Sequence, residues 1–86
     1  MNILDSKAQW RAHMAAVHAL PADYQKVYKL IQNYLFKAGV SRSQAATATA
    51  LSTLLELFQA GAARQADVLA VTGDDVAAFA DGLLQA

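Results

Sequence analysis

The amino-acid sequence predicts an all-α fold, with four to five short helices in one compact domain over residues 1–86, and three observations support this prediction. The chain contains four glycines and one proline, so residues that interrupt helices are few. Alanine, which has the strongest helix propensity, supplies much of the 56% hydrophobic content. Apolar residues also recur at helical spacing in several segments. This hydrophobic share is too high for a disordered chain, so we expect a packed core.

The first half of the chain predicts two helices that meet at Pro21. The first helix should follow an N-cap at Asp5 and end near Ala19. Because proline suits the first turn of a helix, a second helix is expected over residues 21–38, with Gly39 just past its end. Side chains at helical spacing form one apolar stripe along this second helix: Tyr24, Val27, Tyr28, Ile31, Tyr34 and Leu35.

A long third helix is expected next, because Ser41 and Gln44 have the spacing of a capping box. Its apolar arc is wide, which predicts a central helix that packs on two sides. The sequence leaves open whether this helix ends before Gly61 or continues through it. The main face of this helix consists of Gln44, Thr47, Ala48, Leu51, Leu54, Leu55 and Phe58. A second face, of small residues, consists of Ala46, Ala50, Thr53 and Leu57.

The C-terminal part predicts a short helical turn after Asp67 and then a last helix. This helix is expected to be capped around residues 72–74, with Asp74 and Asp75 in its first turn, where the helix dipole favours negative charge. Its predicted buried stripe consists of Val76, Phe79, Ala80 and Leu83.

The composition excludes several classes of protein. Cysteine is absent, which excludes disulfides and thiolate metal sites and fits a reducing compartment. The first ten residues lack the basic and apolar segments of a signal peptide. The longest uncharged run, residues 43–55, is too short to span a bilayer. We therefore expect a cytoplasmic protein that does not associate with membranes.

No group of side chains predicts catalysis, a cofactor or a metal site. His13 and His18 are five residues apart, on different sides of a helix, and are expected to be exposed or half-buried structural residues. Glu56 is the only glutamate and lacks the Glu-x-x-His spacing of a di-iron bundle. A glycine-rich phosphate loop and an activated nucleophile are also missing. The sequence therefore predicts a protein that is not an enzyme and binds no cofactor.

Charge is distributed unevenly along the chain, although the net charge is zero. Residues 1–42 carry a net charge of about +4 and residues 43–86 about −4. Two explanations stay open: basic and acidic helices pack beside each other, or the charges guide a partner. The zero net charge argues against strong nucleic-acid binding, because that affinity depends on neutralising phosphates.

The second predicted helix carries the first candidate interaction surface, which consists of Lys26, Lys29, Asn33, Phe36 and Lys37. Phe36 projects about 130° from the middle of the core stripe, among these polar residues. It either packs internally, against the helix end or under the first or last helix, or it is an apolar anchor for a partner within a polar rim. The small-residue face of Ala46, Ala50, Thr53 and Leu57 is the second candidate surface.

Three segments carry a resemblance to a known family: LPADYQKVYKLIQNYLF (20–36), LLELFQAGAA (54–63) and DVLAVTGDDVAAFADGLL (67–84). They resemble short bacterial proteins catalogued as domain of unknown function number 1048, and the pattern VTG-acidic-acidic-V is the most specific part. The resemblance covers nearly the whole chain. It implies about five helices wound as a left-handed superhelix in a bacterial, cytoplasmic protein.

The same resemblance brings functional labels but no site residues. The family is sometimes labelled DNA-binding and ferritin-like, and its members are often found beside PadR-type transcription regulators. This chain departs from the family pattern at QAGAARQAD (59–67), which is less acidic, and at AATATA (45–50).

We therefore predict a small helical module for protein–protein interaction, with a protein partner or a second copy of itself, linked to transcriptional or stress regulation. The alternative is weak nucleic-acid binding through the lysine stripe of the second helix, with Arg42 just beyond it.

Overall fold

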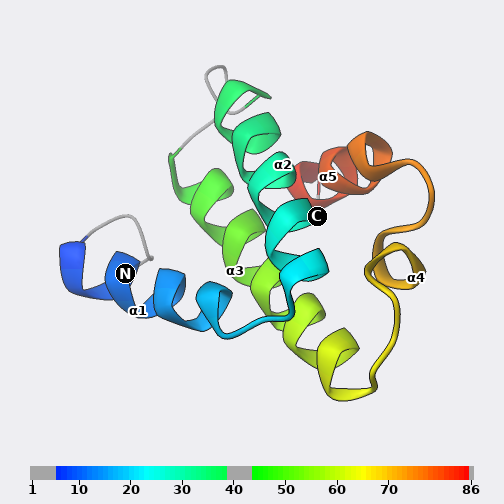
Figure 1. Ribbon diagram of the computed structural model, residues 1–86. Helices are drawn as coiled ribbons and strands as arrows, with labels where there is room; N and C mark the ends of the chain where they lie inside the picture. The colour runs from blue at the N-terminus through cyan, green and yellow to red at the C-terminus, as the bar shows by residue number, and fades with distance from the viewer. Residues whose placement is uncertain (1–5, 39–43, 86) are drawn as a thin grey trace.

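Five α-helices make up the part of the chain that the computed structural model describes, residues 6–38 and 44–85 (Figure 1). In chain order they are α1 (Lys7–His18), α2 (Ala22–Ala38), α3 (Gln44–Ala63), α4 (Val68–Thr72) and α5 (Val76–Gln85). The all-α prediction is confirmed. The predicted helix end at Gly39 and the predicted cap at Ser41 lie outside the described residues.

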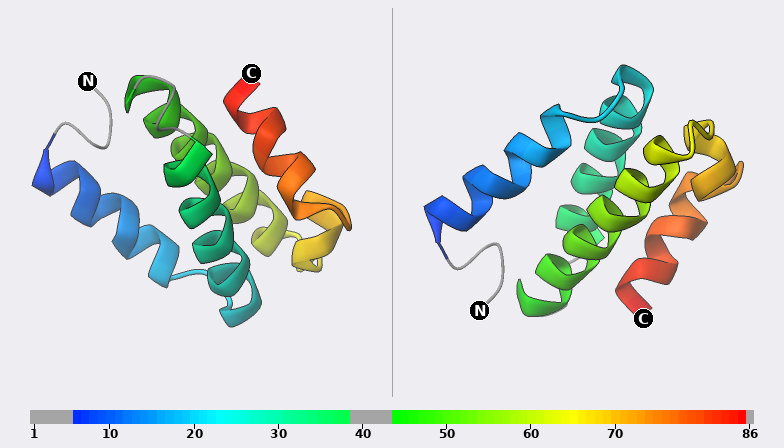
Figure 2. Two further views of the ribbon diagram at one scale, coloured as in Figure 1. Left: turned by 90° about the horizontal axis from the view of Figure 1, so that it is seen from above. Right: turned by 90° about the horizontal axis from the view of Figure 1, so that it is seen from below.

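Helices α2 and α3 form the centre of the molecule, and each of them packs against all four other helices. Helix α1 lies on one side of this pair and α4 and α5 lie on the other, as the views in Figures 1 and 2 show. Helix α1 packs against α2 and α3 alone among the described helices. The prediction that the third helix is central is therefore confirmed.

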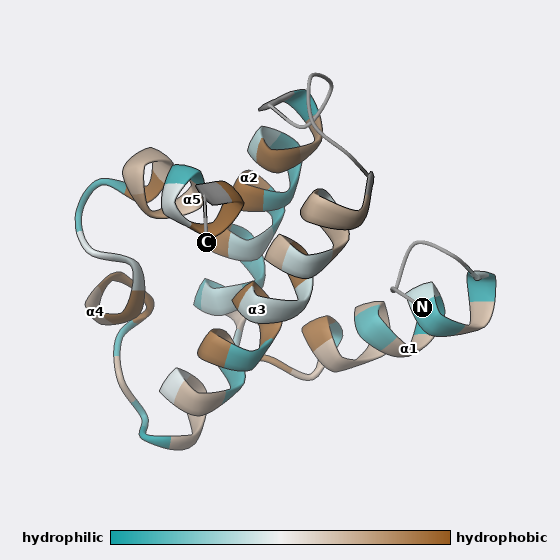
Figure 3. Cartoon of the chain, turned by 180° about the vertical axis from the view of Figure 1, so that it is seen from behind, coloured by the Kyte–Doolittle hydropathy of each residue, from teal (hydrophilic) through white to brown (hydrophobic). Residues whose placement is uncertain are grey.

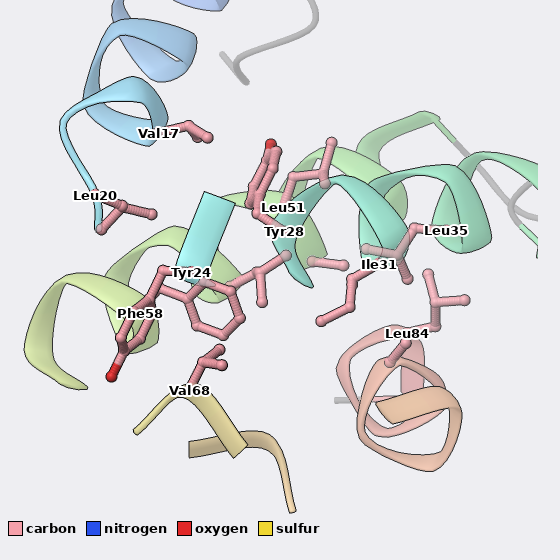
Figure 4. Packing of buried hydrophobic residues seen from close by; sticks show 13 residues of the cluster. Val17, Leu20, Tyr24, Tyr28, Ile31, Leu35, Leu51, Phe58, Val68 and Leu84 are labelled. Carbon is pink, nitrogen blue, oxygen red and sulfur yellow. The ribbon is translucent and has the colours of Figure 1, made fainter. Parts of the chain in front are cut away.

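The core lies between these helices, and its side chains converge from all five of them (Figure 4). The predicted stripe of α2 supplies four buried side chains: Tyr24, Tyr28, Ile31 and Leu35. Tyr24 and Phe58 of α3 meet edge to face, with 5.2 Å between ring centroids. In α5 the buried residues are Ala80 and Leu84, and the sequence analysis missed the latter.

The helices differ in hydropathy, and the polar composition of α1 agrees with its position at the edge of the molecule. Helix α4 is coloured mostly brown or beige in Figure 3, whereas α1 carries polar residues along much of its length. In α1 the buried residues are His13 and Val17. A helix that is covered on one side only needs a narrow apolar stripe, so this composition suits its place at the edge.

Two helix starts differ from the sequence prediction by one residue. Ser6, and not Asp5, is the N-cap of α1, because its hydroxyl accepts a hydrogen bond from the Gln9 N–H at 3.1 Å. Helix α5 begins at Val76, so Asp74 and Asp75 precede it and do not lie in its first turn. The Asp75 carboxylate accepts a hydrogen bond from the Ala78 N–H at 3.0 Å, which is the usual N-cap contact.

Helix α3 continues through Gly61 and ends in a Schellman motif. The Ala66 N–H donates to the Gly61 carbonyl at 3.0 Å, and the Gln65 N–H donates to the Ala62 carbonyl at 3.0 Å. Gln65 has φ 59°, the left-handed conformation that glycine most often supplies at this position. The sequence has no glycine at position 65, so the end of this helix does not follow from the sequence pattern.

The VTG pattern marks the break between α4 and α5. Gly73 has φ 80° and ψ 175°, a combination that is almost restricted to glycine. Its N–H donates to the Leu69 carbonyl at 2.8 Å, which closes α4. The chain can therefore reverse towards the Asp75 cap without an intervening loop of many residues.

Candidate interaction surface

The polar residues predicted on the second helix lie together on one exposed face of α2. Lys26, Lys29, Asn33 and Lys37 are all exposed, and we call them the lysine face. They occur at helical spacing on the side of α2 opposite to its core stripe. Three positive charges on one helix face create a local field, although the whole chain is neutral.

Phe36 borders the lysine face on the side of α1, and its side chain is exposed in part. It is 40% exposed, and its ring lies beside the indole of Trp10 in α1, with 6.5 Å between centroids and an angle of 55° between the planes. Both explanations offered by the sequence therefore hold in part. The ring packs beside the first helix, and it still presents apolar surface to solvent.

Leu30 borders the lysine face on the other side, towards α5, and is not among the residues predicted for the candidate surface. It is 64% exposed, the highest value among the exposed large apolar side chains. A helical wheel places Leu30 about 100° from the centre of the core stripe. Phe36 lies at a similar angle from this stripe, about 130°, on the opposite side of the helix. Helical spacing alone therefore identifies Leu30 as an apolar residue outside the core stripe.

Leu30 also lines an open, apolar cavity of about 210 Å³ between α2 and α5. The lining residues, which we call the α2–α5 seam, are Leu30, Ile31, Tyr34, Val76, Ala77 and Ala80. Beside it, the Tyr34 hydroxyl donates a hydrogen bond to the Asp81 carboxylate at 2.5 Å. This bond raises the pKa of Tyr34, with smaller contributions from burial and from the negative charges of Asp81 and Asp75. The basic second helix and the acidic last helix therefore lie side by side.

The second candidate surface, the small-residue face of α3, does not form a continuous exposed patch. Ala50 is 1% exposed and belongs to the core, so its assignment to a surface is wrong. Ala46 and Thr53 are partly buried, and Leu57 is 40% exposed. The reason is the central position of α3, since neighbouring helices use its small residues for close packing.

A wider groove, of about 760 Å³, separates α1 from α3. It is lined by polar and apolar residues together: Gln9, Ala12, His13, Ala48, Thr49, Ser52, Thr53, Leu55, Glu56 and Gln59. The one imidazole in this lining belongs to His13, whose Nε2 lies 2.6 Å from the Tyr28 hydroxyl. That hydrogen bond is buried, so the ring is held in the interface between α1 and α2.

His13 is part of an aromatic cluster between α1 and α2. Its ring stacks on Trp10, with 5.6 Å between centroids and 18° between planes, and meets Tyr28 at 5.8 Å. It is 5% exposed, which corrects the expectation of an exposed or half-buried residue, whereas His18 is exposed. Burial lowers the pKa of His13 and raises the pKa of Tyr28, so both groups favour their neutral forms.

Two further searches cover the described residues only. Within residues 6–38 and 44–85, no three histidine, aspartate or glutamate side chains come together where they could hold a metal ion. In the same part of the chain, none of the helices combines the length and the apolar composition that crossing a bilayer requires.

Comparison with known proteins identifies relatives of the whole chain. The family described as "Protein of unknown function (DUF1048)" matches residues 1–86. A crystal structure of a DUF1048 protein from Bacillus cereus ATCC 10987, described as a left-handed superhelix fold, is 45% identical to this chain. The similarity covers 85% of this chain and 89% of that chain, with a TM-score of 0.78. No curated protein matches the sequence. The predicted left-handed superhelix is thereby confirmed.

Proposed function

We propose a function for this chain, which belongs to the DUF1048 family of proteins of unknown function: it is a non-catalytic module that binds another protein through the exposed face of α2. The observation that supports this proposal is the pair of exposed apolar side chains, Leu30 and Phe36, that border the lysine face. Apolar anchors next to a polar, charged rim are the usual arrangement of residues at protein interfaces.

The two anchors differ in what already covers them. Trp10 lies beside Phe36, so part of this ring is already packed before a partner arrives. Leu30 is more exposed and stands at the edge of an apolar cavity, which gives a partner both a side chain to cover and a space to fill. A surface that is ordered before binding loses less conformational entropy when a complex forms.

The contacts of His13 support a binding role over catalysis. His13 is buried and hydrogen-bonded to Tyr28, and the nearest acidic residue in the groove lining, Glu56, is an exposed side chain on α3. A general base must reach the proton it removes, and a buried, partnered imidazole does not.

Site-specific photocrosslinking in cells tests this proposal. A photoreactive residue at position 33, in the middle of the lysine face, is expected to give a crosslinked protein product. The same group at position 64, at the exposed end of α3, serves as the matched control. Leu30→Ser and Phe36→Ser should each reduce the product from position 33, because each removes an apolar anchor.

Equal crosslinking from positions 33 and 64, or a product that is unaffected by both serine substitutions, would overturn the proposal. Circular dichroism of the two serine variants shows whether they still fold. Because both side chains are exposed or half-exposed, we expect a loss of stability of about 1 kcal/mol or less in Leu30→Ser and about 1–2 kcal/mol in Phe36→Ser.

Weak nucleic-acid binding is the second candidate, because three exposed lysines lie on one helix face. The salt dependence of binding distinguishes nucleic-acid binding from protein binding. A phosphate-binding surface would shift random duplex DNA at low salt and lose that shift at moderate salt. We expect no shift, and a salt-sensitive one that disappears in a Lys26→Glu, Lys29→Glu variant would favour nucleic acid over protein as the partner.

The link to transcriptional or stress regulation rests on the family resemblance alone. It is a prediction about where the partner acts and does not follow from any side chain described above.

A further inference from the structure

We propose that the α2–α5 seam binds a second copy of this chain, so that the protein forms a symmetric dimer through it. This inference rests on the proposed function and names the partner of one side of that face, the side of Leu30; Phe36, on the side of α1, lies outside the seam. The seam combines an unpartnered apolar side chain, an apolar cavity and two edges of opposite charge.

The apolar part of the seam is incomplete in a single chain. Six residues line its cavity, and all are aliphatic except Tyr34, whose hydroxyl is already bonded to Asp81. Leu30 is 64% exposed at the edge of this cavity, and the small side chain of Ala77 is exposed across from it. A second protein surface laid along the seam would remove these apolar atoms from water.

The edges of the seam carry opposite charges. On α2, Lys26 and Lys37 lie four residues before and seven residues after Leu30, on the same side of the helix. On the side of α5, Asp74 and Asp75 precede the helix, and Asp81 lies on it with its carboxylate bonded to Tyr34. All five of these charged side chains are exposed.

This arrangement is complementary to itself under two-fold symmetry. When two copies face each other across an axis that runs along the seam, the basic edge of each copy lies over the acidic edge of the other. A two-fold interface uses the same patch on both chains, so both charge contacts form at once. Nucleic acid would meet the acidic edge unfavourably, whereas a second copy brings both signs of charge.

The direction of the two helices decides which residues meet. The Tyr34–Asp81 hydrogen bond lies further along both helices than Leu30 and Val76, so α2 and α5 run in the same general sense along the seam, as the left view of Figure 2 also shows. A rotation about the seam axis keeps positions along it. Lys26 of one copy is therefore expected near Asp74 of the other.

Sedimentation equilibrium over a range of protein concentrations tests the inference. The apparent mass of the wild type is expected to rise from 9.2 kDa towards twice that value. Because the patch is small, we expect a dissociation constant in the micromolar range. Leu30→Asp should weaken dimerisation about tenfold or more, by placing a charge at the apolar centre. Leu69→Asp, at an exposed leucine of α4, is the matched control and should leave dimerisation unchanged.

A charge exchange between two variants gives a sharper test. Lys26→Glu alone and Asp74→Lys alone should each dimerise less than the wild type, because each homodimer then faces two repulsive contacts. An equimolar mixture of the two should dimerise again, because both contacts in the mixed dimer pair opposite charges. Lys29→Glu, the matched control, makes the same change of charge as Lys26→Glu but should by itself dimerise like the wild type, since Lys29 lies on the opposite side of the lysine face.

Three results would overturn the inference: a monomer at millimolar concentration, a dimer that Leu30→Asp leaves intact, or equal weakening of the dimer by Lys26→Glu and by Lys29→Glu. These outcomes are distinguishable from failure of the proposed function. A monomeric protein whose position 33 still crosslinks to a different protein, dependent on Leu30, removes the second copy as partner and keeps the interaction face. A monomer without any such product removes both.

Discussion

At the scale of single residues, His13 shows how a polar side chain can be committed to structure. Its Nε2 is bonded to the Tyr28 hydroxyl at 2.6 Å and its ring is stacked on Trp10, so it joins α1 to α2. Helical spacing could not identify this role, because His13 lies on a helix whose apolar stripe is sparse. The partner on α2, fifteen residues away, supplies the hydrogen bond that makes burial acceptable.

The buried state of His13 predicts a stability that falls at acidic pH. Burial lowers the His13 pKa below its usual 6.5, so the unfolded chain binds this proton more readily than the folded chain. The free energy of unfolding should therefore decrease as the pH falls below 6.5. Urea unfolding at several pH values measures this decrease in the free energy of unfolding. His13→Gln should flatten this pH dependence, whereas His18→Gln, at the exposed histidine, should leave the pH dependence unchanged. The reverse result would contradict the assignment of the pH dependence to His13.

Gln65 is a second residue whose local conformation predicts a measurable effect. It adopts φ 59° at the position of the Schellman motif where glycine is most favourable. Gln65→Gly should therefore raise the free energy of unfolding by about 0.5–1 kcal/mol, because the strain of the left-handed conformation exceeds the entropy that glycine loses on folding.

The control for Gln65 is a glycine inside the same helix. Ala63→Gly, at an exposed position in the last turn of α3, should lower stability by about 1 kcal/mol or less. Thermal or urea unfolding compares both variants with the wild type. If both glycines destabilise equally, the left-handed conformation of Gln65 carries no strain.

At the scale of helices, Gly61 sets how closely α3, α4 and α2 approach one another. A methyl group at this position would lie 2.5 Å from Cγ2 of Val71 and 2.8 Å from the Tyr24 hydroxyl oxygen. The same hydroxyl donates to the Ala66 carbonyl at 2.6 Å, which ties α2 to the segment between α3 and α4. The glycine is therefore required by close packing between helices and not by the conformation of its own backbone.

Gly61→Ala should destabilise the protein by about 1–3 kcal/mol, because Val71 and Tyr24 would both have to move. Gly82→Ala is the matched control, since nothing lies within 4 Å of the position where its methyl group would be. There the higher helix propensity of alanine should stabilise α5 by up to about 1 kcal/mol. Opposite signs in urea unfolding would support this account, and a neutral Gly61→Ala would contradict it.

Helix positions could be predicted from the sequence where one physical signal was strong. The stripe of α2 was predicted completely because its apolar residues keep helical spacing from Tyr24 to Leu35. The starts of α1 and α5 were misplaced by one residue because serine and aspartate are nearly equivalent as N-caps. Ala50 was misassigned because an alanine on a helix fits a buried interface and an exposed face equally well.

At the scale of the whole molecule, the arrangement of helices around the α2–α3 pair decides what is exposed. Leu30 and Ala77 are far apart in sequence, so their shared cavity depends on how α5 crosses α2 and could not be read from local spacing. The lysine face was predicted because it lies on one helix. Local patterns therefore predicted the lysine face, whereas the α2–α5 seam depends on the packing of α5 against α2.

The same arrangement predicts that α1 opens more readily than the rest of the chain. Helix α1 packs against two helices, whereas α2 and α3 each pack against four, and α1 buries only His13 and Val17. Native-state hydrogen exchange should therefore give amides of α1 a lower opening free energy than the central amides of α2 and α3, which should exchange by global unfolding. His13→Gln should lower the α1 values further and leave the values in α5 unchanged. If the amides of α1 and α3 share one opening free energy in every variant, the five helices unfold as a single unit and this prediction is wrong.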